Sequence, residues 1–291
     1  MIFGLNLPNY SSLGNRESMI AIAESAEELG YSSLWTSDHI LLPTNLPEPF
    51  GNLLETFTTL SYLAARTETI RLATGILVLP QRDPLLVAKQ AATVHHLSAG
   101  RLTLGLGVGW IAQEYAFLRA DFGTRGQLAD EYIRAIRVLF ESDHPDYHGA
   151  HIDFSDALFS PRPNAPIPIV VGGNSKAALR RAAALGDGWH GLRLSPDAAG
   201  VAISTMNEIG HKSDFAVSLR VQTRVGGPVD DADPATTLHG DADAIVEQLR
   251  RYGEAGVQQL VIEPFSGNLT DFLEQMRLFA REIAPGLLGR P

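Results

Sequence analysis

The segment Arg101-Leu-Thr-Leu-Gly-Leu-Gly-Val-Gly-Trp110 decides the fold, together with the residues 111–115 that follow it. Its apolar residues predict a buried strand, its glycines a turn, and residues 111–115 the start of a helix. In parallel α/β proteins, loops after the carboxyl ends of strands bind ligands, and glycine lets the backbone approach them closely. The glycines lie two residues apart, so they do not match the G-x-G-x-x-G fingerprint. The segment therefore predicts a strand–turn–helix unit at a ligand site and disfavours a Rossmann domain.

Length and composition limit the class of protein. The chain has 291 residues, 45% of them hydrophobic, which accommodates two ordinary domains or one α/β barrel. The absence of cysteine excludes disulfides and a cysteine nucleophile, and it favours a cytoplasmic location. A formal net charge of −10 argues against nucleic-acid binding. The first residues lack a basic signal region, and no apolar run approaches the roughly 20 residues of a membrane span, so we expect a soluble protein that acts on small molecules.

Short apolar segments alternate with amphipathic segments along the chain. We predict eight β-strands, each leading towards a helix, over residues 2–7, 33–36, 70–78, 102–107, 167–171, 188–192, 217–224 and 259–262. Asp83, Ser175 and Ser195 precede three of the predicted helices and are typical N-cap residues. Eight alternating units predict a single (β/α)8 TIM barrel over residues 1–291, with a parallel sheet buried on both faces.

Residues 143–163 interrupt this alternation between the fourth helix and the fifth strand, and we predict an inserted hairpin there. The insertion contains His144, His148 and His151 with nearby aspartates, which are residue types that bind metals. Their spacing matches no helix-borne H-x-x-x-H site. We therefore expect an exposed loop or edge ribbon and no metal site.

Two strand ends carry polar or flexible residues that a barrel would bring to one mouth. Asp38 and His39 follow the second strand. An imidazole beside a carboxylate can position a cofactor ring or move a proton near neutral pH, although capping and packing explain the pair as well. Gly75 interrupts the apolar third strand, which predicts a bulge, the close approach of a flat ligand, or packing alone.

The fifth strand leads into Gly172-Gly-Asn-Ser175 and a helix. Two glycines and the free amides of the helix start predict a phosphate site, although an ordinary strand–helix turn has the same features. Asn174 and Ser175 add hydrogen-bonding side chains. Arg193, after the sixth strand, reaches the same rim, where it either binds the phosphate or faces water.

Five groups of residues carry a resemblance to a known family. They are Ser33-Leu-Trp-Thr-Ser-Asp-His39, Ala73-Thr-Gly-Ile-Leu-Val-Leu-Pro80 with Arg82-Asp-Pro84, Leu97-Ser-Ala-Gly-Arg101, Gly107-Val-Gly-Trp110, and Gly172-Gly-Asn-Ser175 with Gly186-Asp-Gly-Trp189. With them the chain resembles the bacterial luciferase-like monooxygenase superfamily, in the subgroup of probable coenzyme F420-dependent oxidoreductases. The resemblance runs nearly end to end. It implies a luciferase-type TIM barrel with an insertion before strand five and a flavin or deazaflavin across the mouth.

The resemblance also implies roles for individual residues. Asp38 and His39 would lie beside the cofactor ring, with His39 influencing hydride or proton transfer. A non-proline cis peptide would join Gly75 and Ile76 beneath the ring. The other implied cofactor contacts are Thr74, Gly107, Val108, Gly109, Gly172, Gly173, Asn174, Ser175 and Arg193.

The chain departs from part of this family directly after the glycine turn. Relatives that oxidise sugar phosphates have a catalytic glutamate where this chain has Trp110. Because Trp110 is large, flat and mostly apolar, we expect it to line the substrate pocket or the ring site. Glu114, one helical turn later, is an alternative catalytic group, although an exposed glutamate that favours the helix dipole explains it equally well.

Three functions remain open. The first and preferred one is an F420-dependent oxidoreductase that transfers a hydride between the deazaflavin and a small organic substrate. The second is an FMN-dependent monooxygenase, for which a separate reductase supplies reduced flavin that activates O2. The third is a non-catalytic flavin-binding protein. The resemblance also implies a homodimer, and the substrate is not encoded in any segment that we can interpret.

Overall fold

Eight strands close into a parallel barrel in the computed structural model, which describes residues 1–46, 50–227 and 233–285. In chain order they are β1 (Ile2–Leu7), β2 (Ser33–Thr36), β3 (Arg71–Thr74), β5 (Leu102–Gly107), β8 (Ile169–Gly172), β9 (Gly188–Leu192), β10 (Ala216–Val225) and β12 (Gln259–Pro264). The pairing of β9 with β10 completes the ring. The predicted TIM barrel is confirmed, and four of its strands have the predicted bounds.

The remaining strands lie outside this ring or extend it. The predicted third strand, residues 70–78, is split into β3 and β4 (Leu77–Val78), and β4 pairs with β5. β6 (Tyr147–His148) and β7 (Asp153–Phe154) form the antiparallel hairpin that we predicted in the insertion. β11 (Thr237–Gly240) pairs with the last four residues of β10. This strand was not predicted, because its four residues have no apolar run.

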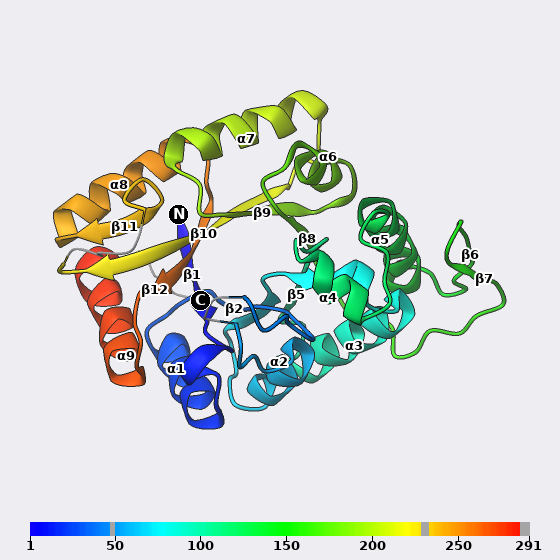
Figure 1. Ribbon diagram of the computed structural model, residues 1–291, viewed down its shortest axis with the longest axis horizontal. Helices are drawn as coiled ribbons and strands as arrows, with labels where there is room; N and C mark the ends of the chain where they lie inside the picture. Colours follow the sequence, from blue (N-terminus) through cyan, green and yellow to red (C-terminus); the bar gives the residue numbers. More distant parts are fainter. Residues whose placement is uncertain (47–49, 228–232, 286–291) are drawn as a thin grey trace.

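Helices cover the outside of the barrel (Figure 1). They are α1 (Arg16–Glu28), α2 (Thr56–Ala64), α3 (Pro84–Leu97), α4 (Ala112–Phe117), α5 (Arg125–Glu141), α6 (Lys176–Leu185), α7 (Pro196–Ile209), α8 (Ala242–Glu254) and α9 (Leu269–Leu278). The predicted caps Asp83, Ser175 and Ser195 are confirmed, since each side chain accepts a hydrogen bond from a first-turn amide. No helix in the described ranges has the length and apolar character of a membrane span.

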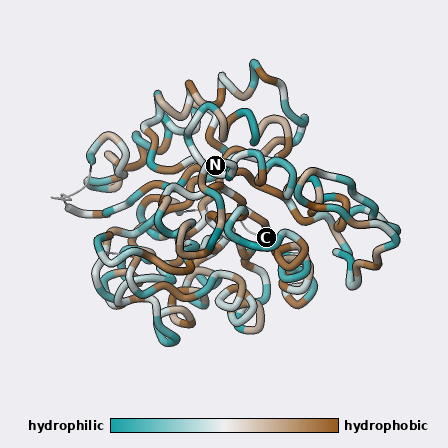
Figure 2. Tube along the Cα trace, turned by 45° about the vertical axis from the view of Figure 1, so that its right-hand side comes forward, coloured by the Kyte–Doolittle hydropathy of each residue, from teal (hydrophilic) through white to brown (hydrophobic). Residues whose placement is uncertain are grey.

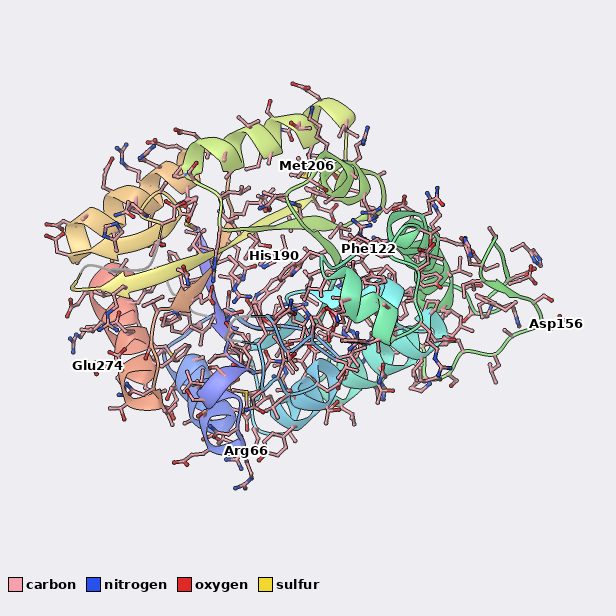
Figure 3. All side chains as sticks on the ribbon, in the orientation of Figure 1. Arg66, Phe122, Asp156, His190, Met206 and Glu274 are labelled. Atoms are coloured by element: carbon pink, nitrogen blue, oxygen red, sulfur yellow. The ribbon has the colours of Figure 1, made fainter. Side chains whose placement is uncertain are left out.

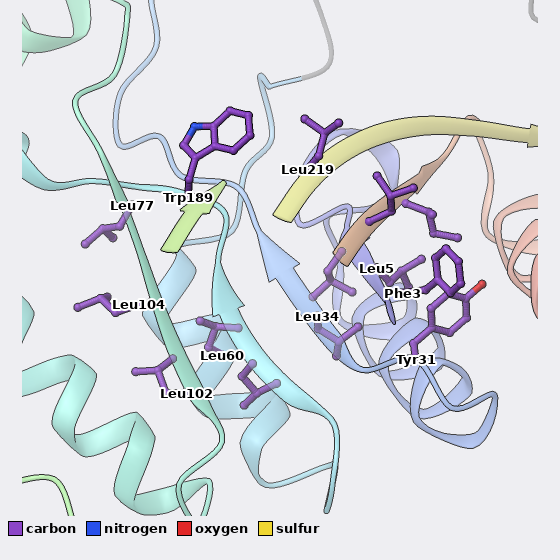
Figure 4. Packing of buried hydrophobic residues seen from close by; sticks show 14 of the residues in the cluster. Phe3, Leu5, Tyr31, Leu34, Leu60, Leu77, Leu102, Leu104, Trp189 and Leu219 are labelled. Atoms are coloured by element: carbon purple, nitrogen blue, oxygen red, sulfur yellow. The ribbon is translucent and has the colours of Figure 1, made fainter. Parts of the chain in front are cut away.

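The two faces of the strands have different partners. Side chains that point outward, such as Leu104, Leu34 and Leu219, pack with the helices in one large apolar core (Figure 4). In Figure 2 the colours of the outer helices alternate between hydrophobic and hydrophilic, as expected of helices that pack one face against the barrel. The inward face of β5 is different, because Gly105 and Gly107 alternate there with the outward leucines. The space beside these two glycines is occupied by the end of β3 and by Ile76, which follows it.

Candidate active site

The carboxyl ends of the barrel strands surround a cavity of about 460 Å³, which we call the mouth cavity. Its wall consists of the loops after β2, β3, β5 and β8, the end of β9, and the starts of α5 and α6. The structure brings most of the predicted site residues to this wall: Asp38, His39, Gly75, Ile76, Val108, Gly109, Trp110, Gly172, Gly173, Asn174 and Ser175. Residues far apart in the sequence therefore meet at one site.

His39 and Glu114 form a pair at one side of the mouth cavity. His39 Nδ1 lies 3.0 Å from Glu114 Oε2, and Glu114 Oε1 accepts a hydrogen bond of 2.7 Å from the amide of Ile40. Burial by itself would raise the pKa of Glu114, but the bonds from His39 and Ile40 outweigh it and lower that pKa. Glu114 is only 1% exposed, so its interpretation as a solvent-exposed helix-start residue is wrong.

The carboxylate of Glu114 also decides which nitrogen of His39 carries a proton. An ionised carboxylate only accepts hydrogen bonds, so Nδ1 of the imidazole must donate its proton. Nε2 of a neutral imidazole then holds the lone pair, and it has no hydrogen-bond partner in the described structure. His39 lines the mouth cavity. Its ring packs edge-on against the Phe50 ring, with the two ring centroids 5.2 Å apart. His39 is therefore equipped to accept a proton at Nε2.

Asp38 has a positioning role in the structure. Its two carboxylate oxygens accept hydrogen bonds of 2.7 and 2.8 Å from Arg82, and one of them also accepts the amide of Val78 at 2.8 Å. These bonds tie the loop after β2 to β4 and η2 (Leu79–Gln81). Because both oxygens have protein partners, Asp38 fixes the loop that carries His39.

The Gly75–Ile76 peptide bond is cis, as predicted. The glycines around it make room for this segment. A Cβ at Gly105 would lie 2.0 Å from the Thr74 carbonyl oxygen, and a Cβ at Gly107 would lie 1.8 Å from Cδ1 of Ile76. The alternating glycines of β5 therefore fit the backbone and side chain of the neighbouring strand end, and Ile76 in turn lines the mouth cavity.

Three predicted cofactor contacts do not reach the wall of the mouth cavity. Thr74 is fully buried and donates a hydrogen bond of 2.6 Å to the Gly105 carbonyl. Gly107 packs against Ile76, which occupies the space that its side chain would need. Arg193, with a φ of 47°, directs its guanidinium to Glu263 at 3.2 Å. The resemblance and the strand assignment located these residues at the correct strand ends, but they did not determine which of the residues face the cavity.

The turn before α6 has the features of an anion site. Gly173 has a φ of 115°, which a residue with a Cβ rarely adopts, and Ser175 caps the helix by accepting the amide of Ala178. Asn174 exchanges hydrogen bonds with the backbone of Leu192, so its amide group holds the turn against β9. The first amides of a helix have no partner within it and favour negative charge.

Arg125 is a cation of the mouth cavity that the sequence analysis did not find. It begins α5, lines the same cavity as the turn before α6, and lies over the Phe122 ring at 3.6 Å from its centroid. Its Nε is buried without a hydrogen-bond partner, and within the described ranges no carboxylate forms an ion pair with it. No strand end or motif marks this position, so only the packing of α5 beside α6 reveals it.

His190 and Arg220 form the floor of the mouth cavity, and neither was predicted. His190 lies inside the barrel (Figure 3). Its ring stacks on Trp35, with ring centroids 4.3 Å apart. Arg220 donates two hydrogen bonds to Glu263, at 2.7 and 3.0 Å, and one to the Tyr10 hydroxyl. Burial raises the pKa of Glu263, but Arg220 more than compensates and lowers it to about 2. The Arg220–Glu263 pair therefore stays ionised, with its cationic end at the cavity.

The chain is similar to proteins from Mycobacterium and Amycolatopsis. An uncharacterized protein of Mycobacterium tuberculosis is 38% identical over 186 residues, which cover 59% of this chain and 64% of the relative. The matched region thus spans a little under two thirds of that relative. An F420-dependent glucose-6-phosphate dehydrogenase of Amycolatopsis mediterranei is 24% identical over an alignment that covers 92% of this chain and 94% of the relative.

Solved structures with the same fold include both dehydrogenases and monooxygenases. An F420-dependent secondary alcohol dehydrogenase superimposes with a TM-score of 0.83 at 17% identity over 99% of both chains. The monooxygenase RslO1 from Streptomyces bottropensis also gives 0.83, at 22% identity over 98% of this chain and 99% of that one. The family model described as luciferase-like monooxygenase matches residues 2–233. The chain therefore belongs to the luciferase-like monooxygenase family.

Proposed function

We propose that the protein is an oxidoreductase that transfers a hydride between a deazaflavin of the coenzyme F420 type and a small, uncharged alcohol or ketone. The observation that carries the proposal is the His39–Glu114 pair, which leaves His39 Nε2 open at the mouth cavity. Oxidation of an alcohol releases a hydride from carbon and a proton from oxygen. The deazaflavin supplies the hydride acceptor when it is bound, and His39 Nε2 accepts the hydroxyl proton.

The residues of the mouth cavity fit a cofactor that has a phosphate and a flat ring. Arg125 and the first amides of α6 would hold the phosphate, because they supply positive charge and free N–H groups at one side of the cavity. The positive φ of Gly173 lets the backbone approach it. Ile76 and Val108 line the same cavity and supply apolar surface for a ring. The buried, unpartnered Nε of Arg125 supports this assignment.

The charges of the mouth cavity favour an uncharged substrate. Asp38 forms an ion pair with Arg82, and Arg220 forms one with Glu263. Among the described residues of the wall, Arg125 is therefore the one arginine or lysine that has no carboxylate partner. If the cofactor phosphate occupies Arg125, the described wall of the cavity has no other unpaired arginine or lysine for a substrate phosphate. The rim is apolar instead, since Phe50, Phe122 and the 64% exposed Trp110 lie there, as does Leu192.

A direct test is anaerobic reduction of F420 with a series of secondary alcohols, followed by the loss of coenzyme absorbance. We expect kcat/KM to increase about fourfold for each added methylene while the rim accommodates it, since a buried methylene contributes about 0.8 kcal/mol. Glucose 6-phosphate should be a poor substrate, because the cofactor phosphate would already occupy Arg125. Bound F420 with no turnover on any alcohol or ketone would contradict the proposed reaction.

An FMN-dependent monooxygenase is the second candidate, and one observation favours it. The F420 coenzyme carries an oligoglutamate tail, which several cations at the mouth would bind better than Arg125 does, the one arginine of the described cavity wall without a carboxylate partner. FMN carries only the phosphate. The corresponding test is oxygen uptake by the protein with chemically reduced FMN, where consumption coupled to hydroxylation of an apolar substrate would favour the monooxygenase and a partner reductase.

A further inference from the structure

One buried nitrogen at the floor of the mouth cavity has no partner. His190 is 4% exposed and lines the cavity, and its Nε2 makes no hydrogen bond in the described structure. A buried nitrogen without a partner costs free energy, so such atoms are uncommon in folded proteins. Neither the barrel core nor the proposed proton transfer at His39 uses this nitrogen. Its position at the wall of a ligand cavity makes a ligand group the natural partner.

The hydrogen bonds around His190 define what that partner must be. The hydroxyl of Ser218 donates to the Trp189 carbonyl at 3.1 Å and lies 2.9 Å from His190 Nδ1. A hydroxyl has one proton, so Ser218 must accept at its oxygen the proton that Nδ1 donates. Nε2 then carries no proton and is an acceptor. Burial, with a smaller effect of Arg220, lowers the pKa of His190 to about 3, which keeps it neutral at physiological pH.

Arg220 supplies the complementary donor beside this acceptor. Its Nη2 donates to Tyr10 and Glu263, its Nε donates to Glu263, and its Nη1 donates one hydrogen bond of 3.2 Å to Ser37. Nη1 has two protons, so one N–H remains without a partner in the described structure. Arg220 lines the same cavity floor as His190. The floor therefore offers one fixed acceptor and one fixed donor, whatever the pH near neutrality.

We propose that His190 and Arg220 recognise the imide edge of the cofactor ring, with His190 Nε2 accepting its N–H and Arg220 donating to its neighbouring carbonyl. An imide presents a donor between two acceptors, which matches this pair of groups. The inference rests on the proposed function, because it needs a flavin or deazaflavin in the mouth cavity. It assigns His190 and Arg220 as residues that determine which ring edge enters the barrel.

The test measures binding of two pairs of probes by fluorescence titration. The first pair is FMN and FMN methylated at the imide nitrogen, and the second is the F420 deazaflavin chromophore with its counterpart methylated at the same nitrogen. Methylation removes the N–H and leaves the carbonyls. We expect the wild-type protein to bind the methylated form of whichever ring it prefers at least about tenfold more weakly, since His190 Nε2 then stays buried and unpartnered.

The variant His190→Phe should remove this discrimination. Phenylalanine keeps a ring against Trp35, so the variant retains the aromatic packing that His190 makes. It should bind the unmethylated ring about tenfold more weakly and the methylated ring as the wild type does. Ser218→Ala should give part of the same effect, because it frees Nδ1 and lets the proton move to Nε2. His211→Phe is the matched control, since His211 is exposed and pairs with Asn207 outside the cavity.

Each outcome separates this inference from the proposed function. Equal affinity of the wild type for the methylated and unmethylated rings, at tight binding of both, overturns the role of His190 and leaves the cofactor assignment in place. An equal loss of both affinities in His190→Phe also overturns it, because that result shows a packing role alone. If the wild type binds neither ring type, the proposed function and this inference both fail.

Discussion

The mouth cavity can be compared with a hollow at the opposite end of the barrel strands, and the two differ in their chemistry more than in their size. The lower hollow lies near the amino ends of β8, β9 and β10, and at about 750 Å³ it is larger than the mouth cavity of about 460 Å³. Its cations have carboxylate partners, with Arg137 and Lys212 on Asp187 and Arg162 on Asp143. The mouth cavity has Arg125 without a carboxylate and an open nitrogen on His39. Unpaired groups, rather than volume, distinguish the functional site.

The two hollows should differ most in how a substitution in each of them changes kcat. His39→Asn removes the proton acceptor and should lower kcat by about 10²- to 10⁴-fold, the usual contribution of a general base. Cofactor affinity should change much less, because the proposed phosphate contacts are Arg125 and the first amides of α6 and do not include His39. Steady-state kinetics with an active alcohol measure this effect. Lys212→Met in the lower hollow is the control and should leave kcat within about twofold; a His39→Asn enzyme as active as that control would refute the assignment.

The second difference is in anion binding. Arg125→Met should weaken FMN binding by about 10- to 100-fold, the usual effect of losing a hydrogen bond to a charged group, and it should leave riboflavin binding unchanged because riboflavin has no phosphate. Fluorescence titrations with the two flavins measure the difference. Arg162→Met makes the matching change in the lower hollow and should alter neither affinity. Equal losses for FMN and riboflavin in Arg125→Met would show that Arg125 supports packing instead of the phosphate.

A third difference concerns how the free energy of unfolding depends on pH. The mouth cavity contains the buried His190, whereas the described wall of the lower hollow contains no histidine. His190 has a pKa of about 3 in the folded protein, so between about pH 6.5 and that value the unfolded state binds more protons than the folded state. The free energy of unfolding should therefore fall as pH decreases, by about 1.4 kcal/mol per pH unit from this group. Urea unfolding between pH 7 and 5 should show a shallower dependence in His190→Phe. An unchanged dependence would mean that His190 is not neutral in the folded protein.

The smallest expected effect concerns the ion pairs of the lower hollow. Lys212 is half exposed and bonds Asp187, whose other oxygen accepts from Arg137. Pairs that are this exposed contribute little, so Lys212→Met should change the free energy of unfolding by less than about 1 kcal/mol. Chemical denaturation at low and high salt measures it. A loss of several kcal/mol would show that the lower hollow depends on its charges as much as the mouth cavity does.

Much of the fold could be predicted because its signals are local. Apolar runs marked the barrel strands, and Asp83 and Ser195 before proline marked two helix starts, since a cap depends only on residues a few positions apart. Gly75 marked the irregular end of the third strand. The strand β11 was missed because its residues, Thr237–Gly240, have no apolar alternation and depend on β10 for their pairing.

The sequence predicted which strand ends form the site, but it did not predict which side chains contact one another there. Glu114 lies behind His39 because α4 folds over the loop after β2, and no spacing encodes that distance. Arg193 was expected at the phosphate, but its backbone turns the side chain to Glu263. Arg125 and His190 lie outside any motif, and they reach the mouth cavity only through tertiary packing. Long-range side-chain direction is the information that one sequence lacks.

The most direct test of the central claim is a parallel titration of the wild type and Gly173→Asp with F420 and FMN, followed by fluorescence. Gly173→Asp places a carboxylate and a strained Cβ in the turn before α6, and Gly210→Asp is the matched control, since Gly210 also has a positive φ but has open space around it. We predict tight, selective F420 binding that Gly173→Asp loses and Gly210→Asp keeps. Selective FMN binding would contradict the deazaflavin assignment, and binding of neither coenzyme would contradict the site itself.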